Sequence, residues 1–212
     1  MKQVLLLLTT LFLLACSKRS NSELDGGTIR MCLETEPITY LTYEVSDYYS
    51  ATIFGQVMEG LVSIDPENLK IKAQLAASWT INDDGSEYTF NIREGVFFHP
   101  HEVFLSDNDR LLTPEDIVKT FELICSPSDQ NAETAAYGHF LKDAIFGASN
   151  FYEKKSKSIE GIKTKDNTVT IKINQKDDNF LFKLAQVQLA VHAKEIIDAK
   201  LVSNIIGTGP FR

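Results

Sequence analysis

LAASWTINDDGSEYTFNIREGVFFH, residues 75–99, and LTPEDIVKTF, residues 112–121, carry most of the information that this chain holds about its fold. In the first stretch Asp83-Asp84-Gly85 is a turn signal, and the apolar residues after it alternate with polar ones. An alternation with a period of two is typical of a half-buried strand. Gly95 is a second breaker before another apolar run. The first stretch therefore predicts a β-hairpin or a meander.

The second stretch predicts the start of a helix. Thr113 supplies a capping hydroxyl, Pro114 suits the first helical position, and the acidic residues of the first turn face the positive end of the helix dipole. Apolar residues then recur at helical spacing: Ile117, Val118, Phe121, Ile124 and Cys125. Ser126-Pro127 predicts the end of this helix, because proline disfavours a helical conformation in the residue before it.

These phrases resemble those of the bacterial extracellular solute-binding proteins that deliver peptides, and sometimes nickel or haem, to ABC importers. The type is that of the dipeptide- and oligopeptide-binding proteins, family 5. The resemblance includes six phrases in the family's order: GGTIR at 26–30, MEGLV at 58–62, SW at 78–79 with its DDG turn, YTFNIREGVFFH at 88–99, TPEDIVKTF at 113–121, and GTGPF at 207–211.

The resemblance implies an α/β fold of mixed α+β type, the amino-terminal part of a two-lobed periplasmic binding protein (type II) fold. It covers residues 26–212, which are expected to form the first lobe and an intermediate subdomain, truncated where the chain returns to the first lobe. The second lobe is expected to be absent. In peptide-binding relatives that lobe supplies the acidic residue that captures the ligand's amino terminus, and hinge closure buries the peptide.

Residues 1–15 are expected to form a lipoprotein signal peptide. Lys2 gives it a positive end, and its apolar stretch at residues 4–14 is too short to span a bilayer as a helix. LLAC at residues 13–16 resembles the lipobox of bacterial lipoproteins, in which Cys16 would carry the lipid. Residues 16–25 would then form the lipidated cysteine and a flexible tether. The alternative is an ordinary signal peptide with a free cysteine.

The charge balance limits the classes of partner. Removing residues 1–15 takes away one lysine and leaves 20 basic and 29 acidic residues, a net charge of −9. This balance argues against binding to nucleic acid and against electrostatic attraction to a membrane surface. Outside the cytoplasm, Cys32 and Cys125 could form a disulfide, and the alternative is that both are small buried apolar residues.

The resemblance also implies where the ligand contacts lie. In the family the loop after the first strand approaches the ligand cleft, and apolar residues at alternate positions predict that strand at Ile29–Leu33. The expected ligand contacts are Glu36, Thr39 and Tyr40 in the following loop, and Thr208 and Gly209 in the GTGP phrase. The glycines of that phrase are typical of a tight turn rather than of a phosphate site.

Local patterns predict the remaining elements. They are a helix capped by Ser46 or Asp47, with Tyr49, Ile53, Val57 and Leu61 in its stripe and Gly60 near its end; a hairpin across Asp166-Asn167; a helix capped by Asn179; a short strand at 187–191; and a helix at 194–201.

Residues 99–110 form a longer connection than the turn that is common in the family, with His99 and His101 near several carboxylates. Zinc motifs place histidines on one helix face or beside cysteine pairs, and a proline between two histidines gives neither arrangement. We therefore expect a surface loop and no metal. The sequence contains no nucleophile elbow, Walker loop or H-E-x-x-H motif, so no catalytic residue and no cofactor are predicted.

The favoured function is that of a substrate-binding lipoprotein of a peptide ABC importer. It would be exported, held on the cell envelope by its lipid, and monomeric. It would capture peptides or a related small solute and deliver them to the ABC permease without acting as an enzyme. A truncated surface lipoprotein that binds a partner without transport is the alternative. An envelope hydrolase is a third hypothesis, based only on the acidic and histidine content.

Overall fold

The computed structural model describes residues 30–127 and 133–212, which divide into two units: the described residues up to Glu34, and a compact second unit at 35–212. The second unit contains the following elements in chain order: η1 (Thr42–Glu44), α2 (Tyr48–Val57), β1 (Val62–Ile64), β2 (Ile71–Ala73), β3 (Ala76–Ile81), β4 (Glu87–Ile92), η2 (Asp107–Arg110), α3 (Pro114–Ile124), η3 (Tyr137–Leu141), α4 (Ala148–Tyr152), β5 (Ile162–Lys165), β6 (Thr168–Lys172), α5 (Phe180–Leu184), η4 (Val187–Leu189) and α6 (Lys194–Asp198). The α/β class predicted from the sequence is confirmed.

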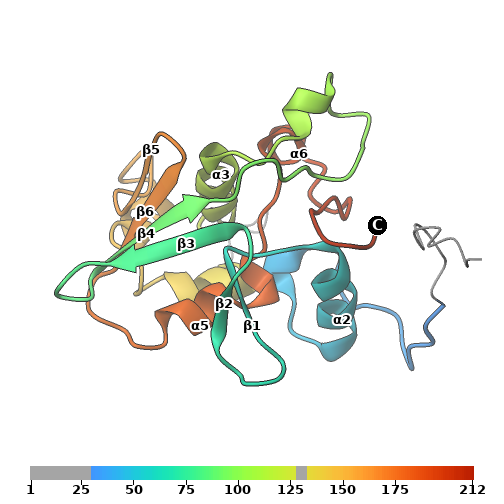
Figure 1. Ribbon diagram of the computed structural model, residues 1–212, viewed down its shortest axis with the longest axis horizontal. Helices are drawn as coiled ribbons and strands as arrows, with labels where there is room; N and C mark the ends of the chain where they lie inside the picture. Colours follow the sequence, from blue (N-terminus) through green and yellow to red (C-terminus); the bar gives the residue numbers. More distant parts are fainter. Residues whose placement is uncertain (1–29, 128–132) are drawn as a thin grey trace, which may run out of the picture. The chain divides into compact units, whose positions relative to one another are not determined.

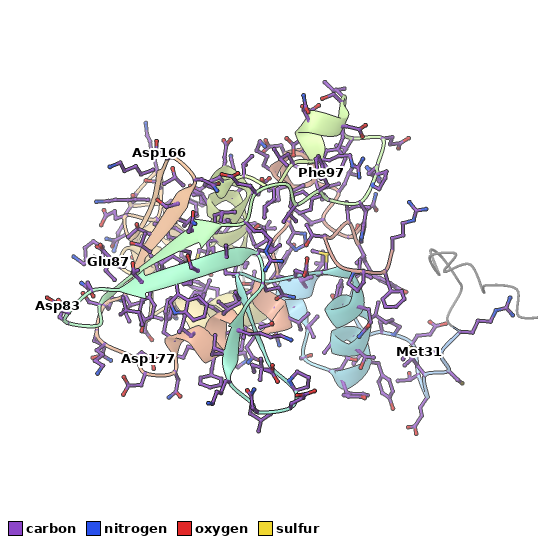
Figure 2. All side chains as sticks on the ribbon, viewed as in Figure 1. Met31, Asp83, Glu87, Phe97, Asp166 and Asp177 are labelled. Carbon is purple, nitrogen blue, oxygen red and sulfur yellow. The ribbon has the colours of Figure 1, made fainter. Side chains whose placement is uncertain are left out.

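An antiparallel sheet of four strands in the order β3-β4-β6-β5 forms the centre of this unit (Figure 1). Both predicted hairpins are present, and their turns carry Asp83 and Asp166 (Figure 2). Phe90 of β4 lies opposite Val169 of β6, and both are fully buried. On the other face the hydroxyls of Thr89 and Thr170 lie 3.0 Å apart. The sheet therefore has one apolar face and one polar face, as the alternating sequence predicts.

Helix α3 covers the apolar face at β5 and β6. It begins at the predicted position, with a capping box in which the Asp116 carboxylate accepts hydrogen bonds from the backbone N–H and the hydroxyl of Thr113, both at 2.7 Å. Ile117, Phe121 and Ile124 face inward and are buried. A smaller pair of strands, β1 and β2, lies outside the main sheet.

Two buried clusters hold the unit together. The larger one lies between the sheet, α3 and α5, and its largest fully buried side chains include Phe90, Phe98, Phe121, Tyr137 and Phe180. The smaller one lies beneath α2 and consists of Val45, Phe54, Val57, Met58 and Ala190. No helix in the described ranges is long and apolar enough to cross a membrane.

Two predicted strands are wrong. The described part of the first, residues 30–33, forms no strand, because every strand of the described residues pairs with another partner. At 187–191 the structure has the short helix η4 instead, followed by extended chain. The pattern of a short apolar run does not distinguish a strand from a buried helix. Here the apolar side chains are buried although the segment pairs with no strand.

Two helices end earlier than predicted. Helix α2 ends at Val57, so Gly60 and Leu61 lie beyond it, and its capping residue Met58 is extended. The carbonyl of Val57 instead accepts a hydrogen bond from the N–H of Gly209. Helix α6 ends at Asp198, and Lys200 adopts a φ of 58°, which a helix does not allow.

Candidate functional site

The loop that contains the first three expected ligand residues lies over the amino-terminal end of α2. The buried hydroxyl of Ser50 accepts hydrogen bonds from the N–H groups of Ile38 and Thr39, at 3.1 and 3.4 Å. Asp47 caps the helix by accepting from the N–H of Ser50 at 2.8 Å. Hydrogen bonding to Ser50 lowers the pKa of the Asp47 carboxyl below its usual value. One helix end therefore fixes the position of the loop.

The three expected residues differ in what they offer to a ligand. Glu36 is exposed, and Tyr40 retains 53% of its exposure. Thr39 is half-buried, and its hydroxyl accepts a hydrogen bond from the N–H of Leu41 at 3.0 Å. Ile38 and Tyr48 are each 75% exposed. Sequence reasoning missed these two apolar side chains, although Tyr48 directly follows the predicted cap.

The GTGP phrase lies against the opposite end of α2. The N–H of Gly209 donates to the carbonyl of Val57 at 2.9 Å, and the N–H of His99 donates to the carbonyl of Gly207 at 2.8 Å. A Cβ atom at Gly207 would lie 1.9 Å from the Val57 carbonyl oxygen. The glycines are thus required by the close approach of two backbones, in addition to any turn.

Thr208 is the polar side chain of this phrase, and it binds Glu59. The Thr208 hydroxyl donates to Glu59 Oε2 at 2.7 Å, while Gln74 Nε2 donates to Glu59 Oε1 at 3.3 Å. The backbone carbonyl of Glu59 accepts from the N–H of Val191 at 2.8 Å. Sequence reasoning did not select Glu59, although it lies in the MEGLV phrase.

The structure does not bring the two groups of expected ligand residues together. Ser50 and Val57, which bind the two segments, are seven residues apart on α2, or about 10 Å along a helix. The segments therefore lie at the two ends of one helix and offer two separate contact points. Figure 1 shows the chain's last residues beside the upper end of α2.

Two hollows in the described residues lie away from these segments. The larger has a volume of about 360 Å³ and lies between η3 and the connection from β6 to α5, lined in part by His139, Lys142 and Lys183. The smaller, of about 310 Å³, lies beside the turn between β3 and β4. Neither is lined by any of the five expected ligand residues.

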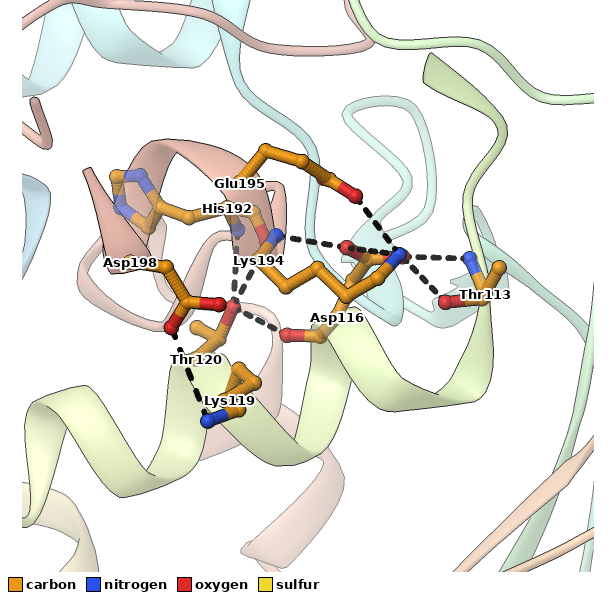
Figure 3. Close-up of polar contacts among 8 residues, drawn as sticks. All are labelled: Thr113, Asp116, Lys119, Thr120, His192, Lys194, Glu195 and Asp198. Atoms are coloured by element: carbon orange, nitrogen blue, oxygen red, sulfur yellow. Dashed lines mark hydrogen bonds and ion pairs between the residues drawn. The ribbon is translucent and has the colours of Figure 1, made fainter. Parts of the chain in front are cut away.

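A buried polar network holds residues 192–198 against α3 (Figure 3). Asp116 accepts from the N–H of Lys194 at 2.8 Å, and the hydroxyl of Thr120 accepts from the N–H of His192 at 2.9 Å. Burial raises the pKa of Asp116, although its hydrogen bonds act in the opposite direction. Burial lowers the pKa of His192 to about 4. Each bond joins two parts of the scaffold, so the network supports the fold.

The histidines of the 99–110 connection contact protein atoms. His99 Nε2 lies 2.7 Å from the carbonyl oxygen of Gly209, and His101 Nδ1 accepts from the N–H of Val103 at 3.2 Å. Within the described ranges no three potential metal-binding side chains gather.

The cysteines differ from one another. Cys125 is buried, and burial raises its pKa to about 12, so its thiol is a poor nucleophile. Cys32 is exposed, and both thiols are free. The disulfide that the sequence left open is therefore not formed. The alternative, a small buried apolar residue, holds for Cys125 but is wrong for Cys32. Cys16, the expected lipid site, and most of the expected tether lie outside the described residues.

Comparison with known proteins gives a consistent result for sequence and structure. Residues 70–212 match the family model described as "Bacterial extracellular solute-binding proteins, family 5 Middle". The chain is 30% identical to "Heme-binding protein A" of Haemophilus influenzae, over 95% of this chain and 39% of that protein. It is 28% identical to "Di/tripeptide-binding protein 1" of Pseudomonas aeruginosa, over 83% of this chain and 32% of that protein.

Among solved structures, the chain resembles a periplasmic oligopeptide-binding protein of Borrelia burgdorferi. The TM-score is 0.71 at 25% identity, and the match covers 84% of this chain and 35% of that one. The chain thus spans between about a third and two fifths of the length of these relatives. The fold is that of part of a periplasmic binding protein.

Proposed function

Because this chain belongs to the bacterial extracellular solute-binding proteins of family 5, we propose that it forms part of a substrate-binding lipoprotein of a peptide ABC importer. The protein would capture peptides outside the cytoplasmic membrane and deliver them to the permease. The family match across residues 70–212 is the observation that carries this proposal. The relatives named for di- and tripeptides or oligopeptides support peptides as the class of solute.

In this proposal α2 carries one wall of a ligand cleft. Tyr40 and Tyr48 at one end offer exposed rings that can cover apolar side chains of a peptide. At the other end, Thr208 and Gly209 would contact polar backbone groups of the peptide. One wall leaves half of a ligand in water, so tight capture requires a second lobe that closes over it.

The mechanism needs no covalent chemistry. Capture would be driven by burial and hydrogen bonding on closure, and release would follow when the closed protein docks on its permease. Export and a lipid on Cys16 would keep the protein at the envelope, where two acyl chains give stable anchoring. These roles make the protein a carrier and not an enzyme, in line with a family of solute-binding proteins.

The test is thermal unfolding of the native protein, purified as its source makes it, with and without a library of peptides of two to five residues. A ligand that binds only the folded state raises the melting temperature by mass action. We expect one or more peptides to raise it by several degrees and to co-purify with the protein. No shift with any peptide, and no co-purifying peptide, would count against the proposal.

Haem is a second candidate solute, because a haem-binding protein is 30% identical to this chain. The same unfolding experiment with haemin in place of peptides separates the two ligands. A shift with haemin alone would favour haem and exclude peptide capture. A native protein that responds to neither, but pulls down a defined envelope partner, would favour the partner-binding alternative.

A further inference from the structure

Thr208 lies at the end of a chain of hydrogen bonds that begins at the backbone amide of Gly60 and runs through Gln74 and Glu59. The N–H of Gly60 donates to Gln74 Oε1 at 3.2 Å, which fixes the orientation of the Gln74 amide. Its Nε2 group therefore faces Glu59 and donates to Oε1 at 3.3 Å. A backbone N–H is always a donor, so this order cannot be reversed.

Glu59 determines the direction of the hydrogen bond with Thr208. A carboxylate accepts and does not donate, so the hydrogen bond of 2.7 Å between Glu59 Oε2 and Thr208 uses the hydroxyl proton of Thr208. A threonine hydroxyl has one proton and two acceptor lone pairs. Once the proton is committed to Glu59, the hydroxyl oxygen can only accept from any other group.

The surroundings of Thr208 strengthen this preference. The N–H of the next residue, Gly209, is already committed to the carbonyl of Val57. Among the ion pairs of the described residues, none joins Glu59 to a lysine, arginine or histidine. Its negative charge therefore disfavours a carboxylate of a ligand nearby and favours a group that carries hydrogen.

We infer that Thr208 is a specificity-determining residue that accepts a hydrogen bond from an N–H group of the peptide, with Glu59 and Gln74 as positioning residues that fix its polarity. The inference rests on the proposed function, since it concerns the ligand of that same site. At Thr208 the ligand would therefore present an amide or amine hydrogen, and not a carbonyl or carboxylate oxygen.

The test is an ester scan of one peptide that binds the native protein. Each amide is replaced in turn by an ester, which removes the N–H and keeps the shape, and affinities are measured by calorimetry. At one position we expect the ester to weaken binding by roughly tenfold, the effect of a lost hydrogen bond at a partly desolvated site. In Thr208→Val that penalty should largely disappear, and in Thr208→Ser it should return.

Glu59→Gln gives an independent arm. Gln74 would still donate to the new side chain's oxygen, so the NH₂ group of the new glutamine would face Thr208 and donate to it. The Thr208 hydroxyl would then be free to donate to an ester oxygen, and the ester penalty should shrink. Thr80→Val, on the exposed part of β3, is the matched control and should leave the penalty unchanged.

The outcomes separate the two proposals. If the native protein binds no peptide, both the proposed function and this inference are overturned. If it binds peptides but shows the same ester penalties in Thr208→Val at every position, the inference alone is overturned. A lower melting temperature of the unliganded variants with unchanged ester penalties would show a purely structural role for Thr208, and would also overturn the inference.

Discussion

At the scale of single residues, His192 shows how burial changes the chemistry of a side chain. It is 2% exposed, and its Nε2 lies 2.7 Å from the hydroxyl of Thr42 in η1. Its Nδ1 atom is buried and has no hydrogen-bond partner among the residues that the structure describes. A charged imidazole would have to be desolvated there, so burial lowers the pKa of His192 to about 4.

This pKa shift predicts a loss of stability in mild acid. The ordinary pKa of histidine is 6.5, so between pH 6.5 and about 4 the unfolded chain binds a proton at His192 that the folded protein does not. The free energy of unfolding should therefore fall as the pH is lowered through this window, by on the order of 3 kcal/mol from this group. Above pH 6.5 the group should have no effect.

Urea unfolding at several pH values measures this contribution. In His192→Gln the free energy of unfolding should change less between pH 6.5 and 4 than in the native protein. The same change at the exposed His139 should leave the pH dependence of the native protein in place. Asp116 acts in the opposite direction, because burial raises its pKa and protonation in acid then favours the folded state. An unchanged slope in His192→Gln would contradict the role given to burial.

At the scale of elements, the ends of α2 are decided by the segments that meet them. Its start is local, because Asp47 caps it three residues before Ser50. Its end is determined by a tertiary contact, because the carbonyl of Val57 accepts a hydrogen bond from the N–H of Gly209, which is distant in the sequence. That approach leaves no room for a side chain at Gly207.

Two glycine substitutions on either side of this contact should have opposite effects. Gly207→Ala should lower the free energy of unfolding by about 2 kcal/mol, because the new Cβ would collide with the Val57 carbonyl and force the two backbones apart. Gly55→Ala should raise it by up to about 1 kcal/mol, since Gly55 is exposed within α2 and a Cβ there meets nothing within 4 Å.

Chemical denaturation of both variants beside the native protein is the measurement. Both substitutions add the same methyl group and have the same general effect on the unfolded chain. Changes of opposite sign in the free energy of unfolding would therefore be due to the close approach of the two backbones at Gly207. A Gly207→Ala variant as stable as Gly55→Ala would show that the GTGP segment does not pack tightly on α2.

At the scale of the whole molecule, the proposed role depends on attachment to the envelope at one end of the chain and ligand capture elsewhere. Lipidation is expected at Cys16, and the ligand contacts are expected on the second compact unit, residues 35–212. A tether between them would allow the binding unit to reach solutes while it remains bound to the membrane.

This arrangement predicts that Cys16→Ala releases the protein from the membrane fraction. Without the thiol no diacylglycerol can be attached, so the intact mass should lack the acyl groups and the protein should become extractable without detergent. Cys32→Ala is the matched control, because Cys32 is an exposed free cysteine outside the expected lipobox, so its loss should leave membrane attachment unchanged. Membrane attachment and mass that are the same in Cys16→Ala and in the native protein would exclude the lipid anchor.

The sequence by itself determined the features that depend on a few neighbouring residues. The hairpin turns at Asp83 and Asp166, the capping box at Thr113 and the cap at Asp47 all form where local patterns predict them. Turn and cap chemistry acts over two to four residues, so the information lies within reach of a pattern. The six phrases that resemble the family also predicted the fold, because six phrases in the family's order are specific.

Only the tertiary structure decided what depends on distant partners. The pairing of β4 with β6, the depth of His192, the early end of α2 and the hydrogen bond between Glu59 and Thr208, 149 residues apart, have no local signal. A strand forms only when a neighbouring strand completes its hydrogen bonds, and no partner pairs with residues 30–33, so that strand was predicted wrongly. The apolar run at 187–191 was predicted wrongly because it is buried as the helix η4 followed by extended chain. A side chain's pKa and hydrogen-bond polarity likewise depend on the groups that folding brings around it.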